Sequence, residues 1–185
     1  MIHLHALVRS RDGIRLATDI YLPGKSASFP TIVQRTPYGK LGEQFVNYAE
    51  WVAEHGYGCV IQDVRGRHDS DGTWHPYDNH EDTDGFDTIE WVTKQRWSNG
   101  RVAFTGSSYG AFAGFMAALT KHPALKALVA RVPASGLYHR HFYYGGIFSL
   151  GRLAWGTLVN GRVLQGTWSQ GQELPIFNRL IKEVP

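Results

Sequence analysis

The sequence contains a single cysteine, Cys59, so it forms no intramolecular disulfide, and a disulfide-stapled secreted domain is excluded. It also lacks an apolar run of 18 residues, which argues against a membrane-spanning helix. Met1 leads into His-Leu-His instead of a charged segment followed by an apolar core, so the start does not resemble a secretory signal. These absences predict a cytoplasmic protein with no membrane partner.

The sequence also has no large excess of positive or negative charge. The 19 Lys and Arg residues against 16 Asp and Glu give a formal net charge of +3, and the basic residues are scattered along the chain. A charge this small and dispersed argues against nucleic acid as a partner. Hydrophobic residues make up 43% of the 185 residues, which excludes a disordered tail and suffices for one domain or a large part of one.

The first 20 residues alternate between apolar and polar positions, as two paired strands do. Residues 2–8 and 14–20 each place apolar side chains on one face, and the Asp-Gly pair at 12–13 between them is a hairpin signal. His3 and His5 fall on the opposite face of the first strand. The period of two therefore predicts that both are plain surface histidines.

Beyond residue 30, short apolar runs alternate with stretches of helical spacing. The runs predict strands at residues 31–35, 57–62, 101–105 and 126–131. Helical spacing covers the intervening residues 45–52 and 86–93, and continues at 109–120. Crossover helices between strands require a parallel sheet covered on both faces. The sequence therefore predicts an α/β fold with a mostly parallel sheet.

Two further patterns concern the second helix and the end of this α/β region. Acidic residues gather at the predicted helix entry, where the positive end of the helix dipole favours them: Asp82, Asp84 and Asp87. Near residue 134 the composition shifts to glycine and aromatic residues without a clean period. We therefore predict an α/β core over residues 1–134 and a separate region over residues 135–185.

The sharpest chemical signal is the segment Gly106–Gly110, which matches the G-x-S-x-G nucleophile elbow with Ser108 at its centre. An apolar strand ends just before it, and a helix with Phe112, Phe115, Met116 and Leu119 on one face begins just after it. The small residues Ala111, Ala113 and Gly114 let that helix lie close to the sheet. An ordinary glycine-rich turn would show the same five residues, but not necessarily this context. The context favours a nucleophilic serine.

An attacking serine requires donors for the oxyanion that develops on the substrate. The backbone N–H of Tyr109 follows the serine and can supply one. A second donor is expected from the segment after the preceding strand, residues 35–40, which lacks the glycine-rich backbone donor of lipases. Tyr38 offers a hydroxyl there instead. Losing one such donor typically costs about 2.7–4 kcal/mol in the transition state.

Three motifs occur in order: Arg35–Tyr38, Gln62–Gly66 and Gly106–Gly110. Together they resemble the X-Pro dipeptidyl-peptidase and cocaine esterase-like family of α/β-hydrolases, over residues 5–150. The resemblance implies the α/β-hydrolase fold, a helical cap that begins in residues 135–185, and serine chemistry without metal or organic cofactor. It also implies Ser108 as nucleophile and Tyr38 and Tyr109 as the oxyanion hole. We interpret Asp63 and Arg65 of the second motif as a structural ion-pair or turn network.

The family order of Ser, then acid, then His leaves the last two triad members unassigned here. The sequence ends at Pro185, within the expected cap, so we expect a fragment that stops before the last strands of the fold. His122, His139 and His141 are expected to be structural or pocket-lining. The strand at 126–131 would then be an exposed edge that pairs with a missing C-terminal segment or another copy, and the chain alone would be poorly stable.

Two weaker patterns remain. Acidic residues and histidines cluster from His68 to Asp84, but the order around Gly72 is not that of a calcium-binding loop, so we predict a solvated loop and no metal site. The second pattern is aromatic. Cap residues are equally suited to an acyl pocket and to a plain hydrophobic seam: Tyr143, Tyr144, Phe148 and Trp155.

The predicted function is serine-dependent hydrolysis of a small ester, amide or short peptide through an acyl-enzyme. The segment Gly39–Gly42 has no acidic residue to hold a substrate ammonium, which favours esterase or acylase action over aminopeptidase-like action. The alternative is a catalytically inactive fragment, or a non-catalytic binding module, that retains the elbow.

Overall fold

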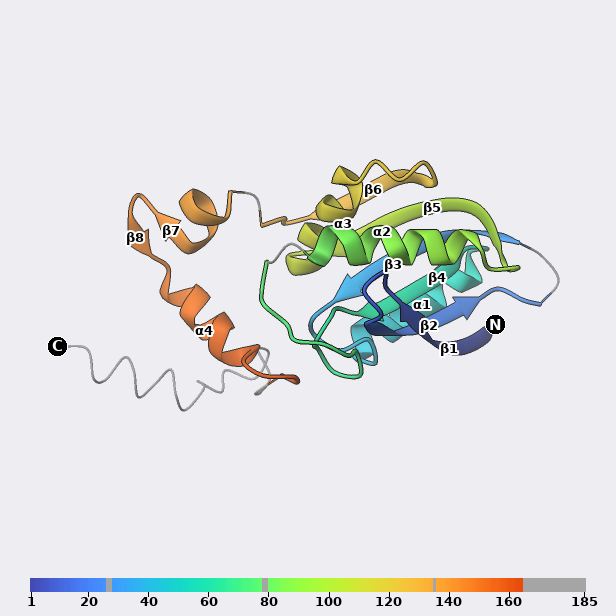
Figure 1. Cartoon of the computed structure of the whole chain (residues 1–185), viewed down its shortest axis with the longest axis horizontal. Helices are drawn as coiled ribbons and strands as arrows, with labels where there is room; N and C mark the ends of the chain where they lie inside the picture. Colours follow the sequence, from blue (N-terminus) through green and yellow to red (C-terminus); the bar gives the residue numbers. More distant parts are fainter. Residues whose placement is uncertain (26–27, 78–79, 135, 165–185) are drawn as a thin grey trace. The chain divides into compact units, whose positions relative to one another are not determined.

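The computed structural model describes residues 1–25, 28–77, 80–134 and 136–164. The chain divides into two compact units, Met1–Pro133 and Ala134–Pro185. The first unit is built on a six-stranded sheet flanked by helices (Figure 1). Each unit is a separate compact body, and the first carries the predicted elbow.

The sheet of the first unit is mixed but mostly parallel. Its strands, in spatial order, are β1 (Ile2–Arg9), β2 (Arg15–Leu22), β4 (Gly58–Asp63), β3 (Phe29–Thr36), β5 (Ser98–Ser107) and β6 (Leu125–Arg131). The strands β1 and β2 form the predicted antiparallel hairpin, and β2 pairs antiparallel with β4. From β4 to β6 every pairing is parallel, which confirms the expected architecture.

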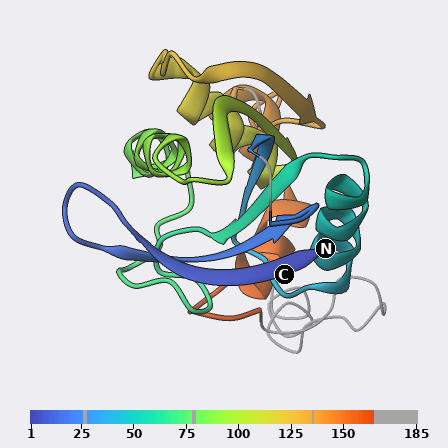
Figure 2. The same ribbon diagram turned by 90° about the vertical axis from the view of Figure 1, so that its right-hand side faces the viewer.

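Helices cover both faces of this sheet, as Figure 2 shows. The helix α1 (Glu43–Glu54) packs on one face, and α2 (His80–Thr93) and α3 (Tyr109–Leu119) pack on the other. Each face has its own apolar core. Under α1 the core includes Phe45, Val52, Cys59 and Ile61, and under α2 and α3 it includes Val33, Val60, Ile89 and Phe104.

The helix α3 lies close to the sheet through its small residues, as the sequence predicts. Phe115 and Leu119 are 42% and 69% exposed, whereas Ala113, Gly114 and Ala117 are buried. A Cβ on Gly114 would lie 2.7 Å from Cδ1 of Leu128, so only small residues fit at this contact. The prediction that small residues let this helix lie close to the sheet is therefore confirmed, whereas Phe115 and Leu119 of the apolar face are exposed.

The prediction that the histidines at the start of the chain lie on the surface is confirmed, because His3 and His5 are both exposed. Both also approach the buried carboxylate of Asp19 on the neighbouring strand. The Nδ1 atom of His5 lies 2.7 Å from Oδ1 of Asp19, and the His3 ring stacks on Tyr21. These contacts belong to a cross-strand pair, which alternation alone does not reveal.

The strand β6 forms the outer edge of the sheet among the described residues, because its recorded pairing is with β5 alone. Val129 on this strand is 57% exposed. An edge strand with apolar side chains is a template for pairing with another strand. Pairing with a further segment or another copy, and the low stability of the chain without it, stay predictions.

The second unit is small in its described part. A single π-helical segment, η1 (Leu137–Phe142), is followed by a short antiparallel pair, β7 (Tyr143–Tyr144) and β8 (Ile147–Phe148), and by helix α4 (Leu150–Leu158). Tyr143 packs edge-on against Phe148, while Trp155 on α4 is buried. Residues 165–185 of the predicted cap lie outside the described residues. Whether these aromatic residues form an acyl pocket stays a prediction.

None of the helices among the described residues is long and apolar enough to cross a membrane.

Candidate active site

Ser108 stands between the end of β5 and the start of α3 with φ 54° and ψ −116°. A positive φ is costly for a serine, and such strain persists only where the surroundings enforce it. The surroundings do so here, because the Ser108 N–H donates to the Arg131 carbonyl at 3.0 Å and its own carbonyl accepts from the Phe112 N–H at 3.1 Å. The strand-turn-helix context of a nucleophile elbow is therefore present.

The two glycines of the elbow are required by close backbone approach. A Cβ on Gly106 would lie 2.3 Å from the carbonyl carbon of Gly110, far inside contact distance. A Cβ on Gly110 would lie 3.2 Å from the Arg35 carbonyl oxygen, which is tight but less severe. The sharp turn that presents Ser108 therefore depends most strongly on Gly106.

Ser108 opens onto a cavity of about 370 Å³ at the carboxyl ends of the parallel strands. Its lining residues come from three strands or their following loops and from α1: Gln34, Tyr38, Gln44, Phe45, Tyr48, Ser107, Ser108 and Arg131. Tyr38 follows β3, which is the neighbour of β5 in the sheet. The structure thus brings Tyr38 and Ser108, 70 positions apart in sequence, to one cavity.

The Tyr109 side chain is fully buried and is absent from this lining. Its hydroxyl donates to Oε1 of Glu81 at 2.8 Å and accepts from the Trp74 indole N–H at 3.2 Å and the Tyr77 N–H at 3.3 Å. Burial, reinforced by the Glu81 carboxylate, raises the pKa of the Tyr109 phenol well above its ordinary value. The phenol therefore stays a donor, and it anchors the residue whose N–H begins α3.

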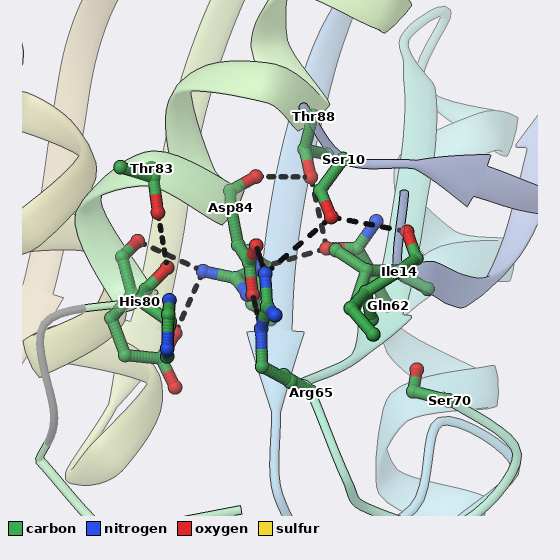
Figure 3. Close-up of polar contacts among 12 residues, drawn as sticks. Ser10, Ile14, Gln62, Arg65, Ser70, His80, Thr83, Asp84 and Thr88 are labelled. Atoms are coloured by element: carbon green, nitrogen blue, oxygen red, sulfur yellow. Dashed lines mark hydrogen bonds and ion pairs between the residues drawn. The ribbon is translucent and has the colours of Figure 1, made fainter. Parts of the chain in front are cut away.

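A buried ionic network lies behind the elbow. Arg35 is fully buried, and its guanidinium donates to the Glu81 carboxylate at 2.7 Å and to the Asp84 carboxylate at 3.5 Å. Asp84 also accepts from Arg65 at 2.6 Å, and Arg65 reaches Asp12 at 2.6 Å. Figure 3 shows Arg65 and Asp84 pointing toward each other, with Thr88 and Gln62 beside them. The network therefore joins the hairpin turn, β3, β4 and the start of α2.

The sequence placed Asp63 and Arg65 in one network, and the structure separates them. Arg65 pairs with Asp12 and Asp84, whereas Asp63 accepts the backbone N–H of Lys40 at 2.7 Å. The acids at the start of α2 also do more than face a helix dipole. Asp84 is 1% exposed and is held by arginine side chains, which a position-based dipole argument does not foresee.

The candidate histidines have other contacts. His122 accepts the Ala124 N–H on Nδ1 at 3.1 Å, and its Nε2 lies 3.2 Å from a Glu90 carboxylate oxygen. These partners agree with a structural role. His141 is buried in the second unit, where its backbone carbonyl accepts from Arg152 at 3.1 Å. His139 packs edge-on against Tyr138 in the same unit.

The acidic loop between β4 and α2 is tied up in ion pairs. Asp69 accepts from the Lys40 ammonium at 3.0 Å, and Asp71 pairs with Arg15 at 2.6 Å. In the part of the chain that the structure describes, no group of three or more His, Cys, Asp or Glu side chains is arranged to hold a metal ion. Asp78 of this loop lies outside that part.

Sequence reasoning missed the groups that hold the candidate site from behind. Glu81, Arg67 and Lys40 were assigned no role, although all three are hydrogen-bonded to residues of the site or its loops. One signal was available. Arg35 ends the predicted strand at residues 31–35, and a charged residue within a predicted buried strand implies a buried partner.

The chain was compared with known families, curated proteins and solved structures. A family model described as X-Pro dipeptidyl-peptidase (S15 family) matches residues 12–179. Cocaine esterase from Rhodococcus is 35% identical over 162 residues, an alignment that covers 84% of this chain and 28% of that protein. The chain thus spans less than a third of the curated relative it matches.

Solved structures agree with the sequence match. An α-amino acid ester hydrolase superposes with a TM-score of 0.75 at 30% identity, over 88% of this chain and 30% of that one. An aminopeptidase from a marine-sediment archaeon (Thaumarchaeota) superposes with a TM-score of 0.74 at 27% identity, over 92% of this chain and 32% of that one. With the strand order and the elbow described above, these matches show that the chain has an α/β-hydrolase fold and belongs to the X-Pro dipeptidyl-peptidase (S15) family.

Proposed function

We propose that this chain carries the nucleophile and oxyanion hole of a serine hydrolase that cleaves esters or amides of small molecules. The observation that carries the proposal is that Ser108, on a strained elbow, shares its cavity with Tyr38. The relatives are an esterase, an ester hydrolase and an aminopeptidase by name, which supports the reaction class.

In the proposed reaction, Oγ of Ser108 forms a bond to the substrate carbonyl carbon, and its proton passes to a general base. The Tyr38 hydroxyl and the Tyr109 N–H donate to the oxyanion of the tetrahedral intermediate. That intermediate collapses by breaking the bond to the alcohol or amine, which takes the proton from the base. Water then attacks the acyl-enzyme in the same manner and releases the acid.

The general base is the missing part. The described residues that line the Ser108 cavity include neither a histidine nor a carboxylate. The proposal therefore assigns the base and its orienting acid to a part of the protein outside this cavity wall, in keeping with the fraction of the relatives that the chain covers. Without them a serine of this kind loses several orders of magnitude in rate.

The first prediction is that a fluorophosphonate probe in large excess forms one adduct with the chain, on Ser108, at a slow rate that reflects the absence of a base among the described residues of the cavity lining. Attack by Oγ forms an O–P bond and expels fluoride, and the intact mass rises by one phosphonyl group. Ser108→Ala is expected to abolish the adduct, whereas Ser98→Ala, at the other end of β5, should keep it. Mass spectrometry before and after exposure reads all three proteins.

A folded chain that shows no adduct would instead favour the alternative, a binding module or an incomplete enzyme whose elbow is built but not activated. Circular dichroism on the same samples separates this outcome from misfolding. An adduct that persists in Ser108→Ala would place the reactive serine elsewhere.

The cavity lining supports esterase or acylase action over capture of a substrate ammonium. Arg131 supplies the charged side chain among the lining residues, while Lys40 turns its ammonium toward Asp69 instead. A positive cavity wall disfavours an amine-bearing acyl group and favours an acidic or carbonyl-rich one.

The second prediction concerns this charge. Arg131→Gln is expected to lower the acylation rate of Ser108 by a glutarate monoester, relative to a butyrate ester, by about fivefold, since an exposed charge pair contributes about 1 kcal/mol. Intact-mass time courses with both p-nitrophenyl esters measure the ratio. Lys126→Gln, near the opposite end of β6, is the matched control. An unchanged ratio in Arg131→Gln would refute a role for Arg131 in substrate choice.

A further inference from the structure

The loop that carries Tyr38 is held on both sides by residues at the end of β4 and in the turn that follows it. On the far side of Tyr38, Oδ1 of Asp63 accepts the Lys40 N–H at 2.7 Å. On the near side, Nε of Arg67 donates to the Pro37 carbonyl at 2.8 Å. The two contacts fix the backbone immediately before Tyr38 and two residues after it.

These two holding residues are themselves fixed. The Asp63 carbonyl accepts from the Ser70 hydroxyl at 2.7 Å, and both Asp63 and Arg67 are fully buried. The Arg67 guanidinium lies over the Trp74 ring, 4.8 Å from its centroid. Gly66 between them has φ +70°, and a Cβ there would lie 2.2 Å from the Trp74 backbone nitrogen. The turn therefore has little freedom to shift.

The Lys40 side chain adds a second hold on the same loop. Its buried ammonium lies 3.0 Å from Asp69 and 3.9 Å from Asp19, which in turn contacts His5. Buried charges of this kind are retained only with partners, so the loop is tied to the hairpin as well as to β4.

We propose that Asp63 and Arg67 are positioning residues that hold the Tyr38 hydroxyl at the Ser108 cavity. The chemistry of this inference rests on the proposed function, in which Tyr38 is an oxyanion donor. A donor acts only when it stands about 2.7–3.1 Å from the developing oxyanion. A displacement of about 1 Å costs on the order of 100-fold in rate. A two-point backbone clamp is the kind of support that such precision needs.

The Asp63 contact is also expected to depend on pH. Burial raises the pKa of the Asp63 carboxyl to about 6, against the opposing effect of the Lys40 N–H. Above that pH the carboxylate accepts a charge-assisted hydrogen bond, and below it the neutral acid accepts a weaker one. The charged groups that face it are Lys40, Arg67 and Asp69, and the His68 ring lies against Gly39 of the same loop.

The first test follows the Lys40 amide proton by two-dimensional NMR on the 185-residue chain between pH 4.5 and 7.5. We expect its chemical shift to titrate with a midpoint near 6, and the Tyr38 amide to follow it. Asp63→Asn, which keeps an oxygen acceptor but cannot ionise, should abolish that titration. A titration that survives in Asp63→Asn belongs to another group, such as His68, and would overturn the assignment.

The matched control is Asp87→Asn. Asp87 also accepts a backbone N–H at 2.7 Å, from Arg11. Neither of these two residues lines the Ser108 cavity. The Lys40 and Tyr38 amides should titrate in Asp87→Asn as they do in the unaltered chain. This control separates the loss of a particular contact from the loss of any carboxylate.

The second test is a double-mutant cycle on the fluorophosphonate reaction. Asp63→Asn and Arg67→Met are each expected to slow labelling of Ser108 by about 10- to 100-fold. In a Tyr38→Phe background the same changes should add less than about twofold, because the hydroxyl that they position is gone. Full additivity of the two effects would contradict positioning through Tyr38 and indicate a general structural role.

The two proposals fail in different ways. If Ser108 does not react at all, the proposed function fails, while the amide titration still decides whether Asp63 holds the Tyr38 loop. Suppose that Ser108 reacts, but Asp63→Asn leaves the titration of the Lys40 amide unchanged and neither Asp63→Asn nor Arg67→Met slows labelling. The positioning inference alone is then wrong.

Discussion

Replacing Arg35 with methionine is expected to destabilise the protein by about 3–5 kcal/mol, because the change leaves carboxylates buried without their cation. Glu81 and Asp84 have side chains only 4% and 1% exposed, and both accept from the Arg35 guanidinium. Arg65 continues to neutralise Asp84, so the larger part of the loss falls on Glu81. Chemical denaturation followed by tryptophan fluorescence measures the effect.

The control for this prediction is Arg11→Met. Arg11 makes a similar ion pair with Asp87, but its side chain is 54% exposed, so its loss should cost about 1 kcal/mol or less. Adding Glu81→Gln to Arg35→Met should recover part of the stability, because the uncompensated charge is then removed. Equal costs for Arg35→Met and Arg11→Met would show that the buried network is not a stabilising feature.

The same network shows where sequence patterns reach their limit. Alternation and helical spacing predicted the hairpin and the parallel sheet, because these patterns depend on which side of each element meets an apolar core. Arg35 and Glu81 are 46 positions apart, and the sequence around neither residue indicates that their side chains are in contact. Asp63 and Arg65 do make the structural turn and ion-pair contacts that were predicted, but their separate partners could not be read from the sequence for the same reason.

The helix α3 shows what composition can add to spacing. Both of its faces carry apolar residues, so the spacing alone does not distinguish the packed face from the exposed one. The small residues Ala113 and Gly114 indicate the close approach to the sheet, and the structure confirms it. The exposure of Phe115 and Leu119 is a tertiary property that the spacing of apolar residues does not express.

The candidate site was predictable to the extent that its requirements are local. The elbow can be recognised from sequence because the residue types at positions 106 and 108 are set by the backbone conformation of a single turn. Tyr38 was predicted from the hydroxyl that it offers in residues 35–40 and from the resemblance. The structure adds the physical reason, since β3 and β5 are neighbours and their loops meet at one sheet edge. The supporting contacts from Asp63 and Arg67 depend on a third strand, and no short motif expresses them.

Gly106→Ala is expected to have the largest effect at the elbow itself: a loss of more than about 100-fold in Ser108 labelling and several kcal/mol of stability. The added Cβ would lie 2.3 Å from the carbonyl carbon of Gly110 and 2.5 Å from its oxygen. Both atoms belong to the backbone of α3, so no side-chain rotation relieves the contact. The turn must open, and Ser108 then leaves the position that its strained φ secures.

Substitutions at two other glycines, where an added Cβ meets less crowding, serve as comparisons for this prediction. Gly110→Ala places its Cβ 3.2 Å from the Arg35 carbonyl oxygen, a contact that a shift of a few tenths of an ångström can relieve, so its effect should be intermediate. Gly24→Ala meets no atom within 4 Å and should leave both labelling and stability nearly unchanged. Labelling rates and denaturation midpoints for the three variants give the order. If Gly106→Ala behaves like Gly24→Ala, the turn tolerates a side chain at that position, and steric crowding is not what forces Ser108 into its conformation.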